Sequence, residues 1–112
     1  IEKNIKIWKK YLIYISKYLI YISKFESEMI FLNKGILLSS IYKIHTTEMG
    51  VDRIKKNLKL NANDVVEFCK NKILDKNCNI YKHGKNWYCE IDNIKITINS
   101  YSYTIITAHL TK

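Results

Sequence analysis

Three side chains in this sequence have the chemistry needed to act on a phosphate group. His45 stands directly before Thr46-Thr47-Glu48, a stretch typical of a helix start, where an imidazole can exchange protons and free backbone N–H groups can hold an anion. Arg53 is the single arginine among 19 basic residues, and a planar guanidinium binds phosphate through two parallel hydrogen bonds. His109 lies in a predicted strand rich in hydroxyl side chains. These residue types suit proton transfer and phosphate binding without a metal.

A cluster of this kind can activate a ribose 2′-hydroxyl, stabilise the charge that develops on the phosphate and protonate the leaving oxygen. The catalytic candidates are His45, Arg53, Tyr103, Thr107 and His109, and the candidates for nucleic-acid binding are Lys56, Tyr88, Lys95 and Tyr101. Simpler interpretations stay open: a helix-capping or solvent-exposed histidine, a structural salt bridge for the arginine, and tyrosines that are merely good strand formers. A serine, metal or nucleotide-hydrolysing enzyme is not expected, because the sequence has no Gly-rich phosphate loop, nucleophile elbow or His-Glu-x-x-His motif.

The cysteines predict neither a metal site nor a disulfide framework. Cys69, Cys78 and Cys89 lack the spacing of a zinc site and cannot all pair with one another. We therefore expect buried free thiols in a reducing cytoplasm, with no metal and no cofactor. No secretory signal and no apolar run of about 18 residues is present, so a transmembrane segment is not expected.

The charge balance is strongly basic and admits two explanations. Lys+Arg number 19 against 10 Asp+Glu, a net charge of +9, which attracts polyanions such as RNA, an anionic membrane face or an acidic protein. The chain is also crowded with Ile, Asn, Lys and Tyr, the residues that AT-rich codons supply, so part of the charge can reflect genome composition.

Residues 86–110 predict three antiparallel strands, and residues 78–82 predict a strand before them. Apolar residues alternate with polar ones, as in Ile94, Ile96 and Ile98, which predicts a sheet with one buried face. In the last strand we expect alternate side chains to point to opposite faces of the sheet. Those expected to point inward are Thr104, Ile106, Ala108 and Leu110, and those expected to point outward are Tyr103, Ile105, Thr107 and His109. The outward face, which also carries Tyr88 and Lys95, is where we expect the chemistry.

Helices are expected before these strands. Residues 36–44 and 48–58 read as helices, the second capped by Thr46 or Thr47 with Met49, Ile54 and Leu58 toward the core. Asn63 is expected to cap a third helix over residues 64–74. The order predicts an α+β fold, in which N-terminal helices pack on a four-stranded antiparallel meander.

Residues 1–34 differ from the domain predicted for residues 35–112. The heptapeptide Tyr-Leu-Ile-Tyr-Ile-Ser-Lys occurs twice in succession, over residues 11–17 and 18–24. In a helix this repeat gives an apolar seam of Leu12, Ile15, Leu19 and Ile22. We expect a helical arm, separated from the domain at Gly35, which covers the sheet, associates with a second copy as a homodimer or lies on a membrane surface.

Several sequence blocks resemble a small bacterial domain family of unknown function. They span residues 43–58, 64–78, 85–88 and 96–109, and include Ile-His-Thr-Thr-Glu-Met-Gly and Tyr-Thr-Ile-Ile-Thr-Ala-His. This resemblance covers roughly residues 35–112. The order of a His, a helix with Arg, a second helix and a meander is more distantly similar to the barnase–RelE type of ribonuclease toxins. That likeness implies metal-independent RNA cleavage on one sheet face and a cognate inhibitor protein, although fold does not establish function. Such toxins carry a dense Arg/Lys cluster, of which only Lys95 is expected here.

Three functions follow as hypotheses. The first is a cytoplasmic, metal-independent ribonuclease of the toxin or defence type, in which His45 and His109 share acid–base work and Arg53 holds the phosphate. The second is a binding module for nucleic acid or protein without catalysis. The third is a self-associating structural protein driven by residues 1–34.

Overall fold

The computed structural model describes the backbone of residues 2–112 and the side chains of residues 9–112. The chain divides into two compact units, residues 1–31 and residues 32–112. The elements in order are α1 (Glu2–Ser39), the 3-10 helix η1 (Ile41–Lys43), α2 (Glu48–Leu58), α3 (Val65–Leu74), β1 (Asn79–His83), β2 (Asn86–Ile91), β3 (Ile94–Asn99) and β4 (Ile105–Leu110).

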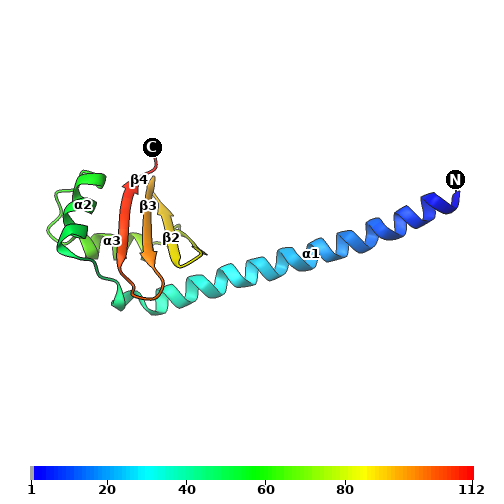
Figure 1. Cartoon of the computed structure of the whole chain (residues 1–112), viewed down its shortest axis with the longest axis horizontal. Helices are drawn as coiled ribbons and strands as arrows, with labels where there is room; N and C mark the ends of the chain where they lie inside the picture. Colours follow the sequence, from blue (N-terminus) through cyan, green and yellow to red (C-terminus); the bar gives the residue numbers. More distant parts are fainter. Residues whose placement is uncertain (1) are drawn as a thin grey trace. The chain divides into compact units, whose positions relative to one another are not determined.

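The four strands form one antiparallel sheet in the order β1-β2-β3-β4 (Figure 1). Short hairpin turns join β1 to β2 and β2 to β3. Gly84 in the first turn and Asp92 and Asn93 in the second adopt positive φ values of 61°, 51° and 62°. Two successive positive φ values match the hairpin turns whose twist suits paired strands. The predicted α+β fold, with helices before a four-stranded meander, is confirmed.

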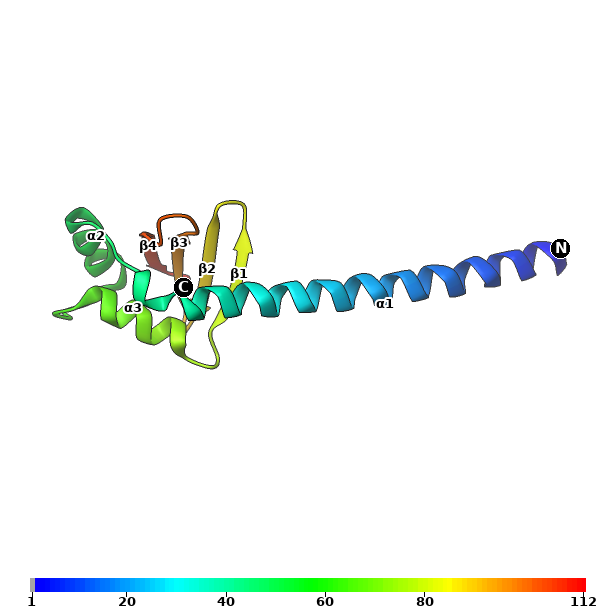
Figure 2. The same ribbon diagram turned by 90° about the horizontal axis from the view of Figure 1, so that it is seen from below.

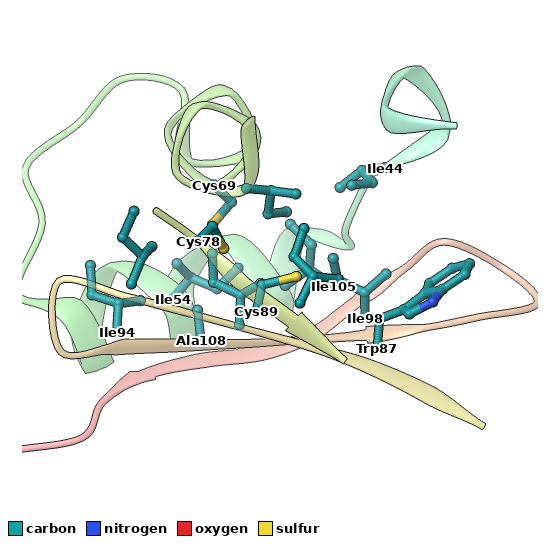
Figure 3. Packing of buried hydrophobic residues seen from close by; sticks show 14 of the residues in the cluster. Ile44, Ile54, Cys69, Cys78, Trp87, Cys89, Ile94, Ile98, Ile105 and Ala108 are labelled. Carbon is teal, nitrogen blue, oxygen red and sulfur yellow. The ribbon is translucent and has the colours of Figure 1, made fainter. Parts of the chain in front are cut away.

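The helices of the domain cover one face and one edge of this sheet. α3 lies against one face and α2 lies beside β4, as both views of the ribbon show (Figure 2). Buried apolar side chains fill the space between α3 and the sheet, among them Cys69 of α3, Ile54 of α2 and Ile98 of β3 (Figure 3). Burial of these side chains supplies most of the stabilisation of so small a domain.

Hydrogen bonds hold the start of α2 against β4. Thr47 is the N-cap, because its Oγ1 accepts a hydrogen bond from the Gly50 N–H at 3.0 Å, as predicted. Thr46 Oγ1 donates to the Ile105 carbonyl at 3.0 Å and so ties the helix start to the sheet. A Cβ at position 50 would collide with Thr46 Oγ1. The bond between α2 and β4 therefore depends on a glycine at this position.

The helices α2 and α3 each differ from the prediction at one position. Met49 is 73% exposed instead of facing the core, whereas Ile54 and Leu58 are buried as expected. In α3, Asp64 rather than Asn63 is the N-cap, so the helix begins one residue later than predicted. Its buried residues are Val65, Cys69 and Ile73, because residues four positions apart lie on the same face of a helix.

The prediction for β4 was wrong over its first half. Ile105 is 2% exposed and packs in the core, whereas Ile106 is 40% exposed. A β-bulge causes this difference, since Ile98 pairs with Ile105 while the adjacent Thr97 pairs with Thr107, which leaves Ile106 without a partner. One extra residue exchanges the two faces of a strand.

The expected break at Gly35 is also absent. α1 continues through this residue to Ser39, and only the short η1 follows before residue 44. A single glycine inside a helix costs about 1 kcal/mol relative to alanine, which is too little to end a long helix. Among the described residues, no helix is long and apolar enough to cross a membrane.

Candidate nucleic-acid interface

The connection between β3 and β4 is a tightly bonded loop. Asn99 Oδ1 accepts hydrogen bonds from the backbone N–H groups of Tyr101 and Ser102 at 2.9 and 3.0 Å. The Asn99 carbonyl accepts from the Tyr103 N–H at 2.9 Å, and the Thr104 carbonyl accepts from the Asn99 N–H at 2.9 Å. An asparagine that bonds the backbone two and three residues ahead is a common way to fix a turn.

Tyr103 has a left-handed backbone at φ 60° within this loop. A bulky residue other than glycine rarely adopts this conformation, and the strain costs on the order of 1–3 kcal/mol. The hydrogen bonds from Asn99 hold the conformation in place. Such strained residues concentrate at binding and catalytic sites, which makes the loop a candidate site.

His45 is bonded into the end of this loop. Its backbone forms an isolated bridge with Thr104, in which His45 N–H donates to the Tyr103 carbonyl at 3.2 Å and its carbonyl accepts from the Ile105 N–H at 2.8 Å. Its ring Nδ1 is 2.9 Å from the Lys43 carbonyl. Because a carbonyl only accepts, Nδ1 must carry the proton, so Nε2 of the neutral ring is the acceptor.

The free acceptor of His45 faces a hydroxyl. Thr104 Oγ1 is 3.2 Å from His45 Nε2, and Ser102 Oγ donates to Thr104 Oγ1 at 2.9 Å. Ser102, Thr104 and His45 thus form a chain of hydrogen bonds that ends at an exposed imidazole. A fixed tautomer with Nε2 directed at a hydroxyl is the geometry of a general base.

Two aromatic rings lie beside the ammonium group of Lys43, two residues before His45. The Lys43 Nζ lies 5.2 Å from the Tyr103 ring centroid and 5.9 Å from that of Tyr42. The outermost rings are those of Tyr42 and Tyr101, which are 73% and 78% exposed. Exposed rings beside cations suit nucleic acid, because bases stack on the rings and phosphates attract the ammonium groups.

Trp87 forms the inner wall of this region. It is 3% exposed, and its ring lies 5.3 Å from that of Tyr103. Figure 3 shows Trp87 at the end of the core next to the β3–β4 loop. Its indole N–H and the nearby Ser100 hydroxyl are buried without a hydrogen-bond partner. Buried unpaired polar groups are uncommon, and two of them here mark the region as specialised. We call this region the loop site; it comprises Tyr42, Lys43, His45, Trp87, Tyr101, Ser102, Tyr103 and Thr104.

The sheet face opposite α3 carries the other candidates. This open face comprises Tyr81, Tyr88, Glu90, Lys95, Thr97, Thr107 and His109. Tyr81 and Tyr88 stack with their centroids 5.4 Å apart, and Lys95 Nζ is 4.8 Å from the Tyr88 ring. Tyr81 also donates a hydrogen bond to Glu90 at 3.3 Å. Tyr88 therefore contacts a neighbour on each adjoining strand.

The structure divides the predicted site residues among three places. His45, Tyr101 and Tyr103 belong to the loop site, so Tyr103 lies against Trp87 and not on the outward face. Tyr88, Lys95, Thr107 and His109 belong to the open face. Arg53 and Lys56 are exposed on α2.

The two histidines expected to share acid–base work are far apart. His45 bridges Thr104, and His109 pairs with Lys95 five residues further along the chain. A rise of about 3.3 Å per residue separates them by roughly 15 Å, more than one phosphate can span. Within residues 9–112, Arg53 makes no ion pair. The structure therefore assembles the loop site without His109.

Sequence reasoning missed Tyr42, Lys43, Trp87 and Ser102 as members of the site. The adjacency of Tyr42-Lys43 to His45 was a usable signal, because consecutive residues share a loop. The contact of Trp87 with Tyr103 was not predictable, since it depends on the left-handed backbone at Tyr103.

The three cysteines belong to the core, where Figure 3 shows them together. Burial raises the pKa of the Cys69 thiol from 9.0 to about 11. A hydrogen bond between the Cys78 and Cys89 sulfurs raises the pKa of Cys89 and lowers that of Cys78. The expected buried free thiols are confirmed.

Fold and site together define a small α+β domain with an aromatic and basic loop site at one end of its sheet. A family model described as a protein of unknown function, DUF3781, matches residues 38–109, and the chain belongs to this family. No match was found among the curated proteins or among the solved structures.

Proposed function

We propose that the domain binds single-stranded nucleic acid at the loop site. The observation that carries this proposal is a pair of freely exposed rings: Tyr42 lies beside Lys43, and Tyr101 lies in the loop whose Thr104 contacts the His45 imidazole. Each base that stacks on an aromatic side chain contributes about 1–3 kcal/mol to the binding free energy, whichever of the bases it is. The net charge of +9 adds long-range attraction to the phosphates.

Rigidity of the loop supports the same proposal. Rings on a mobile loop lose conformational entropy when they bind, whereas the Asn99 bonds hold this loop before any ligand arrives. The strain at Tyr103 is then a cost already met by folding. Cytoplasmic location also belongs to the proposal, since a reducing compartment keeps three free thiols reduced.

The test is fluorescence anisotropy with labelled oligo-uridine and oligo-deoxythymidine. The Tyr42→Ala/Tyr101→Ala variant should bind at least roughly 30-fold more weakly than the unchanged chain, since it loses two stacking platforms. The matched control is Tyr81→Ala/Tyr88→Ala, which removes two tyrosines from the open face and should bind like the unchanged chain. Loss in the control alone would move the site to the open face, and no binding by the unchanged chain would reject the function.

A second candidate function, RNA cleavage, is favoured by one observation, the orientation of His45. With Nδ1–H held by the Lys43 carbonyl, Nε2 would take the proton of a ribose 2′-hydroxyl that replaces Thr104 Oγ1 beside it. The 2′-oxygen would attack phosphorus, the bond to the 5′-oxygen would break, and the imidazolium would return its proton to that oxygen. Lys43 would stabilise the negative charge on the phosphate, in the role expected of Arg53.

Cleavage is tested with end-labelled RNA in the presence of a chelator. The unchanged chain should cut RNA to 2′,3′-cyclic phosphate products and His45→Ala should abolish cutting, whereas the matched control His109→Ala should give the same products as the unchanged chain. Equal loss in both variants would restore a shared role for the two histidines. Binding without cutting would reject catalysis while leaving the binding function intact. An inhibitor protein that covers the loop site is expected only if cutting is found.

A further inference from the structure

The helix over residues 9–31 exposes more apolar surface than an isolated soluble helix tolerates. Large apolar side chains along it are exposed over fractions from 41% at Met29 to 80% at Phe31. Contiguous exposed apolar surface of this kind marks an interaction site. The distribution of side chains along the helix identifies the partner.

A heptad register separates apolar from polar side chains in this helix. When Ile15 is placed at position a of a heptad lettered a to g, the a and d positions form one continuous seam: Tyr11, Ile15, Tyr18, Ile22, Phe25 and Met29. The seam expected from Leu12 and Leu19 ends at Glu26, so it is the shorter of the two.

The polar residues occupy the opposite side. Every lysine and serine of residues 9–31 falls at position b, c or f: Lys9, Lys10, Ser16, Lys17, Ser23, Lys24 and Ser27. The two glutamates of this segment, Glu26 and Glu28, flank the seam at e and g, the positions at which charges set pairing between helices.

We infer that residues 9–31 form a coiled coil with the same segment of a second copy of this chain. A straight helix drifts about 20° per heptad from a seven-residue pattern, so a strict heptad keeps its seam in contact only when helices supercoil around each other. A flat membrane surface offers no such supercoil. The carboxylates beside the seam also disfavour an anionic membrane.

The surface available is sufficient for a stable complex. The six seam side chains of each copy are about half exposed, and burying them in two copies removes on the order of 1,000 Å² from water. The apolar e and g residues add to this area: Leu12, Tyr14, Leu19 and Tyr21. Four apolar residues are exceptions: Ile30 and Phe31 lie at positions b and c, and Ile13 and Ile20 lie at the outward f position.

Ile13 and Ile20 provide a matched control for the test. Light scattering coupled to size exclusion should give at least twice 13.3 kDa for the full chain at micromolar concentrations. The Ile15→Lys/Ile22→Lys variant places charges in the seam and should fall to 13.3 kDa. Ile13→Lys/Ile20→Lys makes the same chemical change at the outward position and should keep the mass of the unchanged chain.

Three results would overturn the inference. A monomeric unchanged chain would do so, and so would equal dissociation by both double variants. The third is binding of the unchanged chain to phosphatidylglycerol vesicles that is weakened equally by both variants, which would indicate a membrane-surface helix. Because none of these measurements uses nucleic acid, failure here is distinguishable from failure of the proposed function.

Discussion

Residues 9–31 and residues 32–112 place the same kinds of side chain in opposite environments. In the domain, the isoleucines, cysteines and Trp87 of the core are between 0% and 8% exposed, whereas Ile20 and Tyr14 of the helix are 70% and 71% exposed. Among the side chains of residues 9–112, every buried apolar residue lies between Leu37 and Ala108. The domain therefore forms its own buried core, whereas the described side chains of the helix leave apolar surface exposed.

The difference teaches that one composition can have two structural uses. Ile and Tyr dominate both regions, but a period of two residues buries them in the sheet and a period of seven residues aligns them along the helix. Four predictions test this contrast, in order of decreasing effect.

The largest expected effect comes from the core isoleucines. Ile98→Ala removes a side chain that is 0% exposed and should lower the free energy of unfolding by about 2–5 kcal/mol. Ile20→Ala makes the same change at a site that is 70% exposed and should alter it by less than about 0.5 kcal/mol. Urea unfolding followed by tryptophan fluorescence measures both, and equal losses would contradict the contrast.

Two glycines provide the next comparison. Gly50→Ala should cost about 1–3 kcal/mol, because the new methyl group displaces the Thr46 hydroxyl from its bond to Ile105. Gly35→Ala adds a methyl group to an exposed helical position with nothing within 4 Å and should gain about 0.5–1 kcal/mol. Thermal unfolding of the two variants should shift in opposite directions, and a loss at Gly35 would show that its environment is not open.

Alkaline pH should destabilise the domain, because buried thiols lose their protons. The pKa of Cys69 is raised from 9.0 to about 11, so the unfolded chain releases this proton first. The contribution of the protonated Cys69 thiol to the free energy of unfolding is complete below pH 9.0 and is lost as pH rises through about 11. This loss is on the order of 1–2 kcal/mol. Cys69→Ala should flatten this part of the profile of unfolding free energy against pH, and an unchanged slope would assign it to other groups.

The smallest effect is expected at the surface of the domain. Lys72 Nζ lies 2.6 Å from Asp92 Oδ2, but the two side chains are 27% and 61% exposed. Solvent and salt screen such a pair, so Lys72→Ala should cost less than about 1 kcal/mol. Lys76→Ala is the control without this partner, and a difference above that value in urea unfolding would mean that the pair acts as a buried one.

The sequence predicted local features best where neighbouring residues decide them. Thr47 caps α2 because its hydroxyl bonds a backbone group three residues ahead. The order of the four strands was likewise predicted, since alternation is a short-range signal. The predicted break at Gly35 was wrong, because the low helix propensity of one glycine is outweighed by the remaining residues of α1.

By itself, the sequence determined the α+β class, the meander, the free thiols and the heptad pattern, all of which follow from periodicity and spacing along the chain. Tertiary structure alone decided which candidates meet. The bulge beside Thr97 exchanges the faces of β4, and the bridge between His45 and Thr104 joins segments 59 residues apart. Such contacts depend on how paired strands and loops satisfy their backbone hydrogen bonds, which no residue spacing encodes.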